Sequence, residues 1–305
     1  MNDQMTGIEI LLEDETLRDG LQVESRIFSL EEKLAIYDLL AQAGIKRIQV
    51  GSFVHPKRVP QMADTDQFIR EIIRRNPDGP LLSALILNGK GLERALDSGV
   101  KHVSMSVSVS NTHSQKNAGK SAPEALEAMT ELIQQAAQAG LTVRAGLQCA
   151  FGCAYEGAIA EKDVLAAAEK LAYSGAAELN LADSTGMASP MSIQSLVCQV
   201  RDLVPDMTLS LHLHDTRGMG MANMYAGYRA GVKTFDVCTG GLGGCPFIRG
   251  AAGNVPTEDA VNMFSSVGAS TGIDMVKLCA IVDILEKSLD KKLPGRMATV
   301  IRSSC

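Results

Sequence analysis

Two histidines separated by one residue, His212 and His214, are the residues whose types and spacing most clearly suggest a catalytic or ligand-binding site. Alternate side chains of an extended strand lie on the same face, so both imidazoles point one way while Leu209, Leu211 and Leu213 point the other. The run ends in a turn-forming Asp-Thr-Arg-Gly. This places both imidazoles at the carboxyl end of a strand, where α/β proteins keep their catalytic groups. The alternative is a pair of hydrogen-bonded polar residues on a solvated strand face.

A second cluster of ionisable residues follows the first predicted strand, in the run from Glu13 to Gly20, which holds four carboxylates and one arginine within seven residues. An ordinary solvated turn can have this composition. On a common rim with the two histidines, however, Asp19 can join them on a cation. Arg18 beside it can then polarise a carbonyl or hold a carboxylate.

A glycine-rich segment, residues 239–254, contains Cys245 and ends at Asn254. Such a segment can be a phosphate cradle, a mobile lid or a plain loop, and the thiol in its middle favours the lid. A thiol on a closing loop can exchange a proton with substrate, although most free cysteines are inert small hydrophobic residues.

These segments together offer two nitrogen and two oxygen ligands for a cation, from Asp19, His212, His214 and Asn254. Positions stay open for substrate oxygens or water. An oxygen-rich, open site of this kind suits Mg²⁺ or Mn²⁺, and Mn²⁺ suits the imidazoles better. Zn²⁺ and Co²⁺ are alternatives.

Composition narrows the class of partner. The 305 residues are 46% hydrophobic and carry a net charge of −6 without a Lys/Arg block. This argues against a nucleic-acid groove or a membrane surface and favours a small-molecule partner. Seven scattered cysteines without a CxxC pair suggest neither a disulfide framework nor a zinc ribbon. With no secretory pattern or membrane-spanning run, we expect a cytoplasmic protein.

The elements that must position these residues repeat one pattern: an amphipathic run, a small residue followed by Gly, then a β-rich run. Gly at a helix end adopts the left-handed conformation that closes the helix. The pattern occurs five times, and its glycines are Gly44, Gly99, Gly140, Gly175 and Gly231. With three further runs, the predicted strands are residues 8–13, 45–50, 81–87, 100–105, 141–144, 176–181, 209–214 and 232–237.

Eight strands alternating with helices predict a (β/α)8 TIM barrel. We expect one catalytic domain over residues 1–305, with the barrel at about 8–256 and additional C-terminal helices at about 257–305. An open doubly wound sheet is the alternative, but a Gly-rich phosphate turn would then be expected after the first strand.

These motifs resemble the 3-hydroxy-3-methylglutaryl-CoA lyase family, among the barrel metal-dependent lyases and synthases called DRE-TIM metallolyases. The resemblance runs nearly end to end, and the matching segments are residues 18–22, 52–57, 59–62, 151–157, 182–186, 212–216, 241–246 and 253–254. The segment with Cys245 is the most specific, because the related condensing synthases generally lack it.

The resemblance implies a role for each matching residue. It implies that the divalent metal is bound by Asp19, His212, His214 and Asn254. Arg18 would stabilise the enolate of the thioester, and Cys245 and His212 would transfer protons. Asp14 and Asp183 match acidic positions, of which Asp183 helps to position the reacting hydroxyl. The resemblance also implies an acyl-CoA substrate and a homodimer.

The chain departs from the lyases in two runs, residues 48–53 and 215–219, where Gln49 stands in place of their typical Glu and Arg217 in place of their Tyr. A lost anion and an added cation favour a more anionic substrate or another acyl group. Restoring Glu at position 49 is expected to raise activity toward methylglutaryl-CoA. Gln49, Ser52 and Asn117 are candidate substrate contacts, the last in a CoA groove after the fourth strand.

The implied reaction is cleavage of a carbon–carbon bond. A chelating cation lowers the pKa of a tertiary hydroxyl, the alkoxide collapses, and the enolate of the thioester leaves and is protonated. The products would be acetyl-CoA and a keto acid, acetoacetate for methylglutaryl-CoA. Alternatives are a Claisen-type condensing acyltransferase, a 4-hydroxy-2-keto acid aldolase and a non-catalytic barrel.

Overall fold

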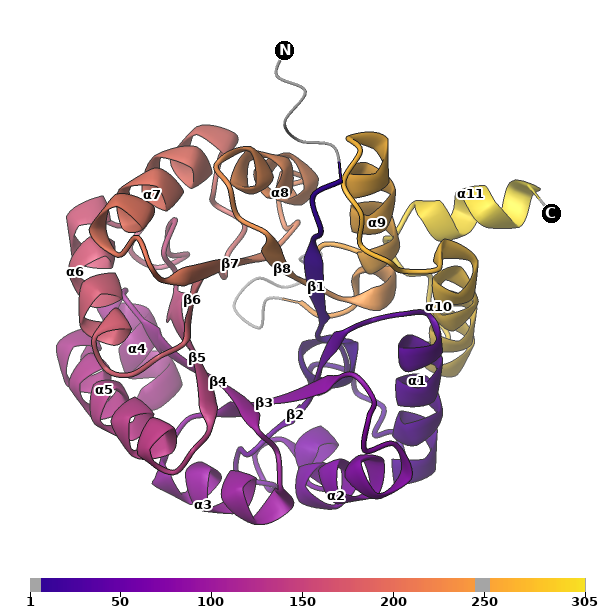
Figure 1. Ribbon diagram of the computed structural model, residues 1–305, viewed down its shortest axis with the longest axis horizontal. Coiled ribbons are helices and arrows are strands. Elements are labelled where there is room, and N and C mark those ends of the chain that lie inside the picture. The colour runs from indigo at the N-terminus through magenta and orange to yellow at the C-terminus, as the bar shows by residue number, and fades with distance from the viewer. Residues whose placement is uncertain (1–6, 245–252, 305) are drawn as a thin grey trace.

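The computed structural model describes residues 7–244 and 253–304. Eight parallel strands close into a barrel in chain order, with β8 paired to β1. Figure 1 shows the strands in a ring with helices outside them. The predicted (β/α)8 barrel is therefore confirmed, and the open doubly wound sheet is excluded.

The strands are β1 Leu11–Asp14, β2 Arg47–Ser52, β3 Leu81–Ile86, β4 His102–Ser108, β5 Thr142–Gln148, β6 Glu178–Asp183, β7 Thr208–Leu213 and β8 Thr234–Val237. The helices around the barrel are α1 Leu30–Gln42, α2 Thr65–Arg75, α3 Gly89–Ser98, α4 Asn111–Ala118, α5 Ala122–Gln138, α6 Glu161–Ala172, α7 Pro190–Leu203 and α8 Gly220–Arg229. Three short turns are η2 Thr16–Gly20, η3 Pro60–Met62 and η4 Thr239–Gly241.

All eight predicted strands are present, and the differences lie at their ends. β1 begins at Leu11 and not at residue 8, because Glu9 forms an isolated bridge with Ser270 outside the barrel. β4 and β5 run further than predicted because they pair with each other as far as Ser108 and Gln148. The sequence pattern alone cannot show this mutual pairing.

Glycine closes helices where the sequence pattern predicts it. Gly44 follows α1 with a φ of +92°, a conformation that side chains disfavour. A Cβ atom at this position would also lie 2.6 Å from the carbonyl oxygen of Gly272. The turn from α1 into β2 therefore depends on glycine for two reasons.

The two faces of the barrel strands differ sharply in polarity. On β7, Leu211 and Leu213 are fully buried in the hydrophobic core between strands and helices. The barrel interior instead holds buried charged side chains, among them Arg144 and Asp236. This polar interior leads up to the carboxyl ends of the strands.

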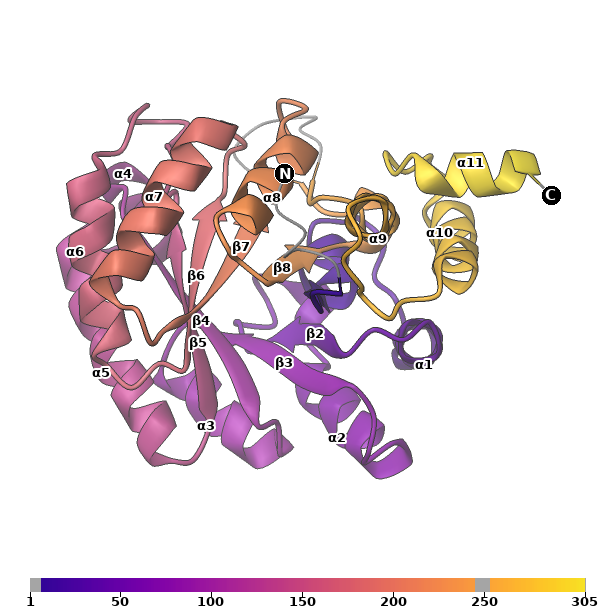
Figure 2. The ribbon, with the colours of Figure 1, turned by 45° about the horizontal axis from the view of Figure 1, so that its top comes forward.

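Three more helices follow the barrel: α9 Thr257–Ser266, α10 Met275–Leu289 and α11 Met297–Ser304. Figures 1 and 2 both show them on one side of the barrel, with α10 beside α1. The predicted C-terminal helices are thus present. Within the described ranges, no helix combines the length and apolar character needed to cross a lipid bilayer.

Candidate active site

A cavity of about 200 Å³ opens at the carboxyl ends of the strands, and its lining includes Arg18, Asp19, His212, His214 and Asp236. Arg18 and Asp19 come from the turn after β1. His212 and Asp236 come from β7 and β8, and His214 directly follows β7. Barrel closure places β8 beside both β7 and β1, so the two motifs predicted from the sequence meet on one rim.

The acidic run after β1 is a packed π-helical turn, η2, and not a solvated turn. Leu17 inside the turn and Leu21 after it are buried, while Arg18 N and Gly20 N both donate to Glu15 O, at 3.0 and 3.1 Å. The buried leucines anchor the turn from below. Arg18 and Asp19 are thereby fixed at the cavity.

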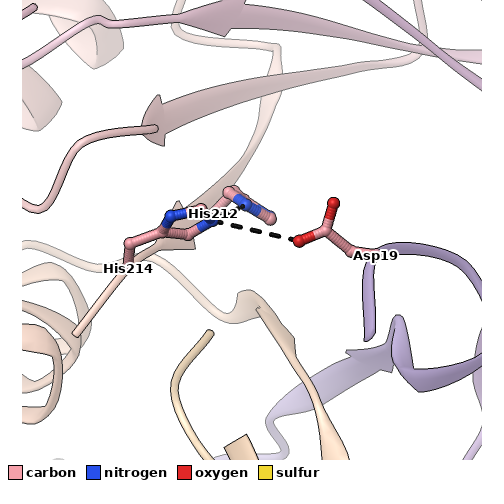
Figure 3. Close-up of side chains that lie close together, drawn as sticks. All are labelled: Asp19, His212 and His214. Carbon is pink, nitrogen blue, oxygen red and sulfur yellow. Dashed lines mark hydrogen bonds and ion pairs between the residues drawn. The ribbon is translucent and has the colours of Figure 1, made fainter. Parts of the chain in front are cut away.

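Asp19 and the two histidines form a compact group of metal-ligand atoms, all within 4.8 Å of one another. In Figure 3 the carboxylate of Asp19 faces the two imidazoles. His214 Nε2 lies 4.0 Å from Asp19 Oδ2 and 3.0 Å from His212 Nε2. Two neighbouring ligands at about 2.1 Å from an octahedral cation are separated by about 3.0 Å, so the imidazole pair fits such an ion.

Asn254 reaches the same position from the segment after η4. A backbone bridge joins it to His214 at the end of β7. Its Nδ2 donates to Asp19 Oδ2 at 2.8 Å, whereas its Oδ1 is buried and has no hydrogen-bond partner among the described residues. An unpaired buried oxygen is costly unless a ligand satisfies it. Asn254 therefore fits the predicted role of an oxygen ligand.

The charges in this group suit a cation. Burial alone would raise the pKa of Asp19, but the positive charges of Arg18 and the imidazoles lower it to about 2. Burial and the charge of His212 lower the pKa of His214 to about 4. Asp19 is then an anion and His214 a neutral imidazole near pH 7, the forms that bind metals.

His212 differs because its other ring nitrogen faces two carboxylates. Burial disfavours the charged ring, but hydrogen bonds to Asp236 and Glu15 outweigh this and raise the pKa of His212 to about 10. Its Nε2 proton then points at His214 Nε2. A divalent cation at this position would displace that proton.

Arg18 is fixed by three acceptors. Its guanidinium donates to Glu15, Asp19 and Gln49, and the side chain is 11% exposed. A guanidinium held on three sides presents a rigid positive charge to the cavity. This is the property needed to stabilise a developing anion.

Gln49 joins Arg18 to Glu13. Its Oε1 accepts from Arg18 Nε, and its Nε2 donates to Glu13 Oε1 at 3.1 Å. Because a guanidinium only donates and a carboxylate only accepts, an amide satisfies both neighbours. This contact opposes the sequence-based expectation that Glu at position 49 would raise activity.

We expect Gln49→Glu to lower both stability and turnover. Burial opposes ionisation of Glu13, but the charges of Arg144 and Arg47 lower its pKa to about 2. A second carboxylate would therefore meet an existing one, at a cost of about 1–3 kcal/mol. Thermal unfolding and kcat measure the effect, and the double variant Glu13→Gln/Gln49→Glu should recover part of both. Higher activity in the single variant would contradict this.

Asp14 and Asp183 hold loops. Asp14 Oδ2 accepts from the hydroxyls of Thr239 and Thr257, at 2.9 and 2.8 Å, and joins β1 to the C-terminal segment. Asp183 accepts the backbone N–H of Met187 at 2.8 Å. Burial raises the pKa of both carboxyls. Within the described part of the chain neither lines the cavity, so a direct catalytic role for either stays a prediction.

Cys245 lies outside the described residues. Gly244, directly before this segment, lines the cavity, and Asn254 after it contacts Asp19. The described residues before and after positions 245–252 therefore both lie at the site.

The predicted substrate contacts lie at different depths. Asn117 lines the cavity and donates to Gln148 Oε1 at 3.4 Å. Ser52 is fully buried and donates to Gln22, which lines the cavity, at 3.3 Å. Asn117 can therefore meet a ligand directly, whereas Ser52 contacts a lining residue.

Sequence reasoning missed the buried residues behind His212, namely Glu15, Asp236 and Arg144. Each occupies an interior position of the barrel or of the turn after β1, and all three are almost completely buried. Asp236 sits opposite His212 in the β7–β8 register. Glu15 belongs to the acidic run after β1 that the sequence already indicates, whereas for Arg144 and Asp236 the available signal was a charged residue within a predicted strand.

Comparison with known proteins extends this picture. A family model described as HMGL-like matches residues 9–285. The (R)-citramalyl-CoA lyase of Chloroflexus aurantiacus is 37% identical over 294 residues, covering 94% of this chain and 93% of that protein. The hydroxymethylglutaryl-CoA lyase of Bacillus subtilis is 36% identical over 287 residues, covering 94% and 95%.

A solved structure agrees with these relatives. An HMG-CoA lyase from Acinetobacter baumannii, in complex with coenzyme A and 3-methylmalate, superposes with a TM-score of 0.89 at 34% identity, covering 95% of this chain and 94% of that one. The resemblance drawn from the motifs is confirmed over almost the whole length. The chain belongs to the HMGL-like family, which includes the hydroxymethylglutaryl-CoA lyases.

Proposed function

We propose that the protein is a divalent-metal-dependent lyase that cleaves 3-hydroxy-3-methylglutaryl-CoA, or a close analogue, to acetyl-CoA and a keto acid. The observation that carries the proposal is the convergence of Asp19, His212 and His214 beside the fixed guanidinium of Arg18. The names of the relatives support a CoA thioester as substrate.

Asp19, His212, His214 and Asn254 would hold the cation, and two oxygen and two imidazole ligands favour Mg²⁺ or Mn²⁺. Such a cation supplies Lewis acidity that lowers the pKa of the substrate's hydroxyl group. The chain contributes the rest of the chemistry. Asp19 balances positive charge at the site, and the buried setting strengthens each electrostatic contact.

Arg18 faces the developing negative charge. A base on the rim of the cavity takes the proton of the substrate's hydroxyl group, and the oxygen left behind forms the carbonyl of the keto acid. As it does so, the bond between C2 and C3 of the acyl group breaks, and its electron pair moves to the thioester and forms an enolate. The guanidinium of Arg18, already held by Glu15 and Gln49, needs no reorganisation to stabilise the enolate oxygen. Cys245 is the proposed donor of the proton that completes the acetyl group of acetyl-CoA, because both ring nitrogens of His212 are engaged, one by the proposed cation and one by Asp236.

We predict that Cys245→Ala lowers kcat by about 10²–10⁴-fold, the usual contribution of a positioned proton donor or acceptor. Mn²⁺ affinity should stay near the wild-type value, since the thiol is not one of the proposed ligands. Steady-state kinetics and Mn²⁺ titration measure the two effects. Cys198→Ala, at an exposed thiol on α7, is the matched control. Wild-type turnover in Cys245→Ala would remove this thiol from the mechanism.

The test is incubation of the purified protein with Mn²⁺ or Mg²⁺ and 3-hydroxy-3-methylglutaryl-CoA, followed by assay of acetyl-CoA and acetoacetate. (R)-Citramalyl-CoA is the second candidate, favoured by the 37% identical relative. The same cleavage of this thioester gives acetyl-CoA and pyruvate. Failure with both thioesters, together with condensation of acetyl-CoA and a keto acid, would replace the lyase with the synthase. Cleavage of a 4-hydroxy-2-keto acid without CoA would indicate the aldolase.

The family resemblance also supports a cytoplasmic homodimer in which residues 1–305 act as one catalytic domain. Light scattering after gel filtration should then give twice the chain mass of 32.4 kDa. A monomer mass at micromolar concentration would contradict the dimer.

A further inference from the structure

We infer that Asp236 is a positioning residue that orients the imidazole of His212 toward the cation, and that Arg144 in turn holds Asp236. The inference rests on the proposed metal-dependent function and adds residues to the site that no sequence motif indicated. Because the effect is on the orientation of the His212 imidazole, it can be tested by metal binding without substrate.

The two ring nitrogens of His212 have different partners. Nδ1 lies 3.2 Å from Asp236 Oδ2 and 3.4 Å from Glu15 Oε2, and both are carboxylate oxygens. Nδ1 must therefore carry a proton, because carboxylates accept and do not donate. Nε2 faces the other way, toward His214. A neutral ring with a protonated Nδ1 leaves the lone pair on Nε2, the atom nearest the other ligands.

Asp236 is itself immobilised. Its Oδ1 accepts from Arg144 Nη1 at 2.5 Å, and its Oδ2 accepts from Asn180 Nδ2 at 3.2 Å as well as from His212. The side chains of Asp236 and Arg144 are only 1% and 2% exposed. A carboxylate with partners on both oxygens in so buried a position has one orientation available to it. Its hydrogen bond to His212 Nδ1 therefore fixes the orientation of the imidazole as well.

The carboxylates on the Nδ1 side are not a second cation site. Glu15, His212 and Asp236 do lie at metal-ligand spacing. However, Arg144 donates to both carboxylates, and Arg18 donates to Glu15 as well. Two guanidinium groups thus already supply the positive charge on this side. The opposite nitrogen, Nε2, is the one left to face the cation.

His214 provides a contrast within the same pair. Its Nδ1 is buried and has no hydrogen-bond partner among the described residues. Its position is set by the backbone bridge to Asn254. A carboxylate therefore orients only one of the two imidazoles, so loss of Asp236 should affect His212 and leave His214 in place.

The test is Mn²⁺ binding to Asp236→Asn, measured by the electron paramagnetic resonance signal of free Mn²⁺. We expect affinity to fall by about 10–100-fold, the usual effect of losing a partner of a metal-ligating histidine. Nitrogen-15 shifts of the Mg²⁺-loaded protein should show that the His212 ring loses its fixed Nδ1–H form. Wild-type affinity in a folded Asp236→Asn would overturn the inference.

Glu178→Gln is the matched control. Glu178 belongs to the same buried network, where it accepts from Arg47 at 2.8 Å and lies 3.9 Å from Arg144. Among the described residues Glu178 contacts Arg47 and Arg144 but not His212, so its loss removes one buried negative charge without touching the ligand. Mn²⁺ affinity should change little in this variant. An equal loss in both variants would overturn positioning in favour of a general charge effect.

If Asp236→Asn does not fold, Asp236→Glu keeps the charge that Arg144 requires and displaces the carboxylate by one methylene. We expect a folded protein with at least about 10-fold weaker Mn²⁺ binding, and unchanged binding would overturn the inference. A wild-type protein that does not bind Mn²⁺ would also overturn it. Weaker binding in Asp236→Asn, with no thioester cleavage by the wild type, would sustain positioning and refute the proposed substrate.

Discussion

Asp19→Asn is expected to abolish metal-dependent cleavage, with Mn²⁺ affinity reduced by more than about 100-fold. This exceeds the usual effect of losing a partner of a ligand, because the ligand itself is changed. Asp19 is the only carboxylate among the four proposed ligands, and its low pKa of about 2 keeps it ionised at any assay pH above 4.

The contacts of Asp19 explain why an amide of the same shape cannot replace the carboxylate. Arg18 donates to one oxygen and Asn254 Nδ2 to the other, at 2.8 Å for the second contact. An amide would direct its own N–H groups at one of these donors. Asp97→Asn, which removes the same charge from an exposed position on α3, is the control. If Asp19→Asn binds Mn²⁺ as the wild type does, the proposed ligand set is wrong.

The second large effect is expected for Arg18→Met, with kcat reduced by about 10²–10³-fold, as for loss of a fixed donor to a developing anion. Mn²⁺ binding should be as tight as in the wild type or tighter. The reason is that removing a positive charge beside Asp19 removes repulsion toward the cation.

Arg18→Lys separates charge from geometry. An ammonium keeps the charge but cannot reproduce the fork of donors that reaches Glu15, Asp19 and Gln49. We therefore expect kcat to recover only in part. Single-turnover assays at saturating Mn²⁺ isolate the chemical step. If Mn²⁺ affinity falls in parallel with kcat, Arg18 acts by holding Asp19 in place and not on the substrate.

The sequence by itself determined the architecture, because its signals are local. A left-handed glycine at the end of a helix, as at Gly44, and alternation of polar and apolar residues, as around His212, act within a few positions. Eight such units in series leave the barrel as the favoured arrangement. The same alternation placed His212 and His214 on one side, and the structure finds their Nε2 atoms 3.0 Å apart.

Only the tertiary structure decided how the charged residues are used. The residues around Glu15 are compatible with a solvated turn as well as with a buried one. No residue near Asp236 in the sequence indicates that its partners are His212 and Arg144. Arg144 and Asp236 are separated by 92 positions and meet only because the barrel closes. Their burial then forces each charge to find a partner. The local sequence pattern determines which segments form helices and strands. Closure of the barrel determines which ionisable groups face one another.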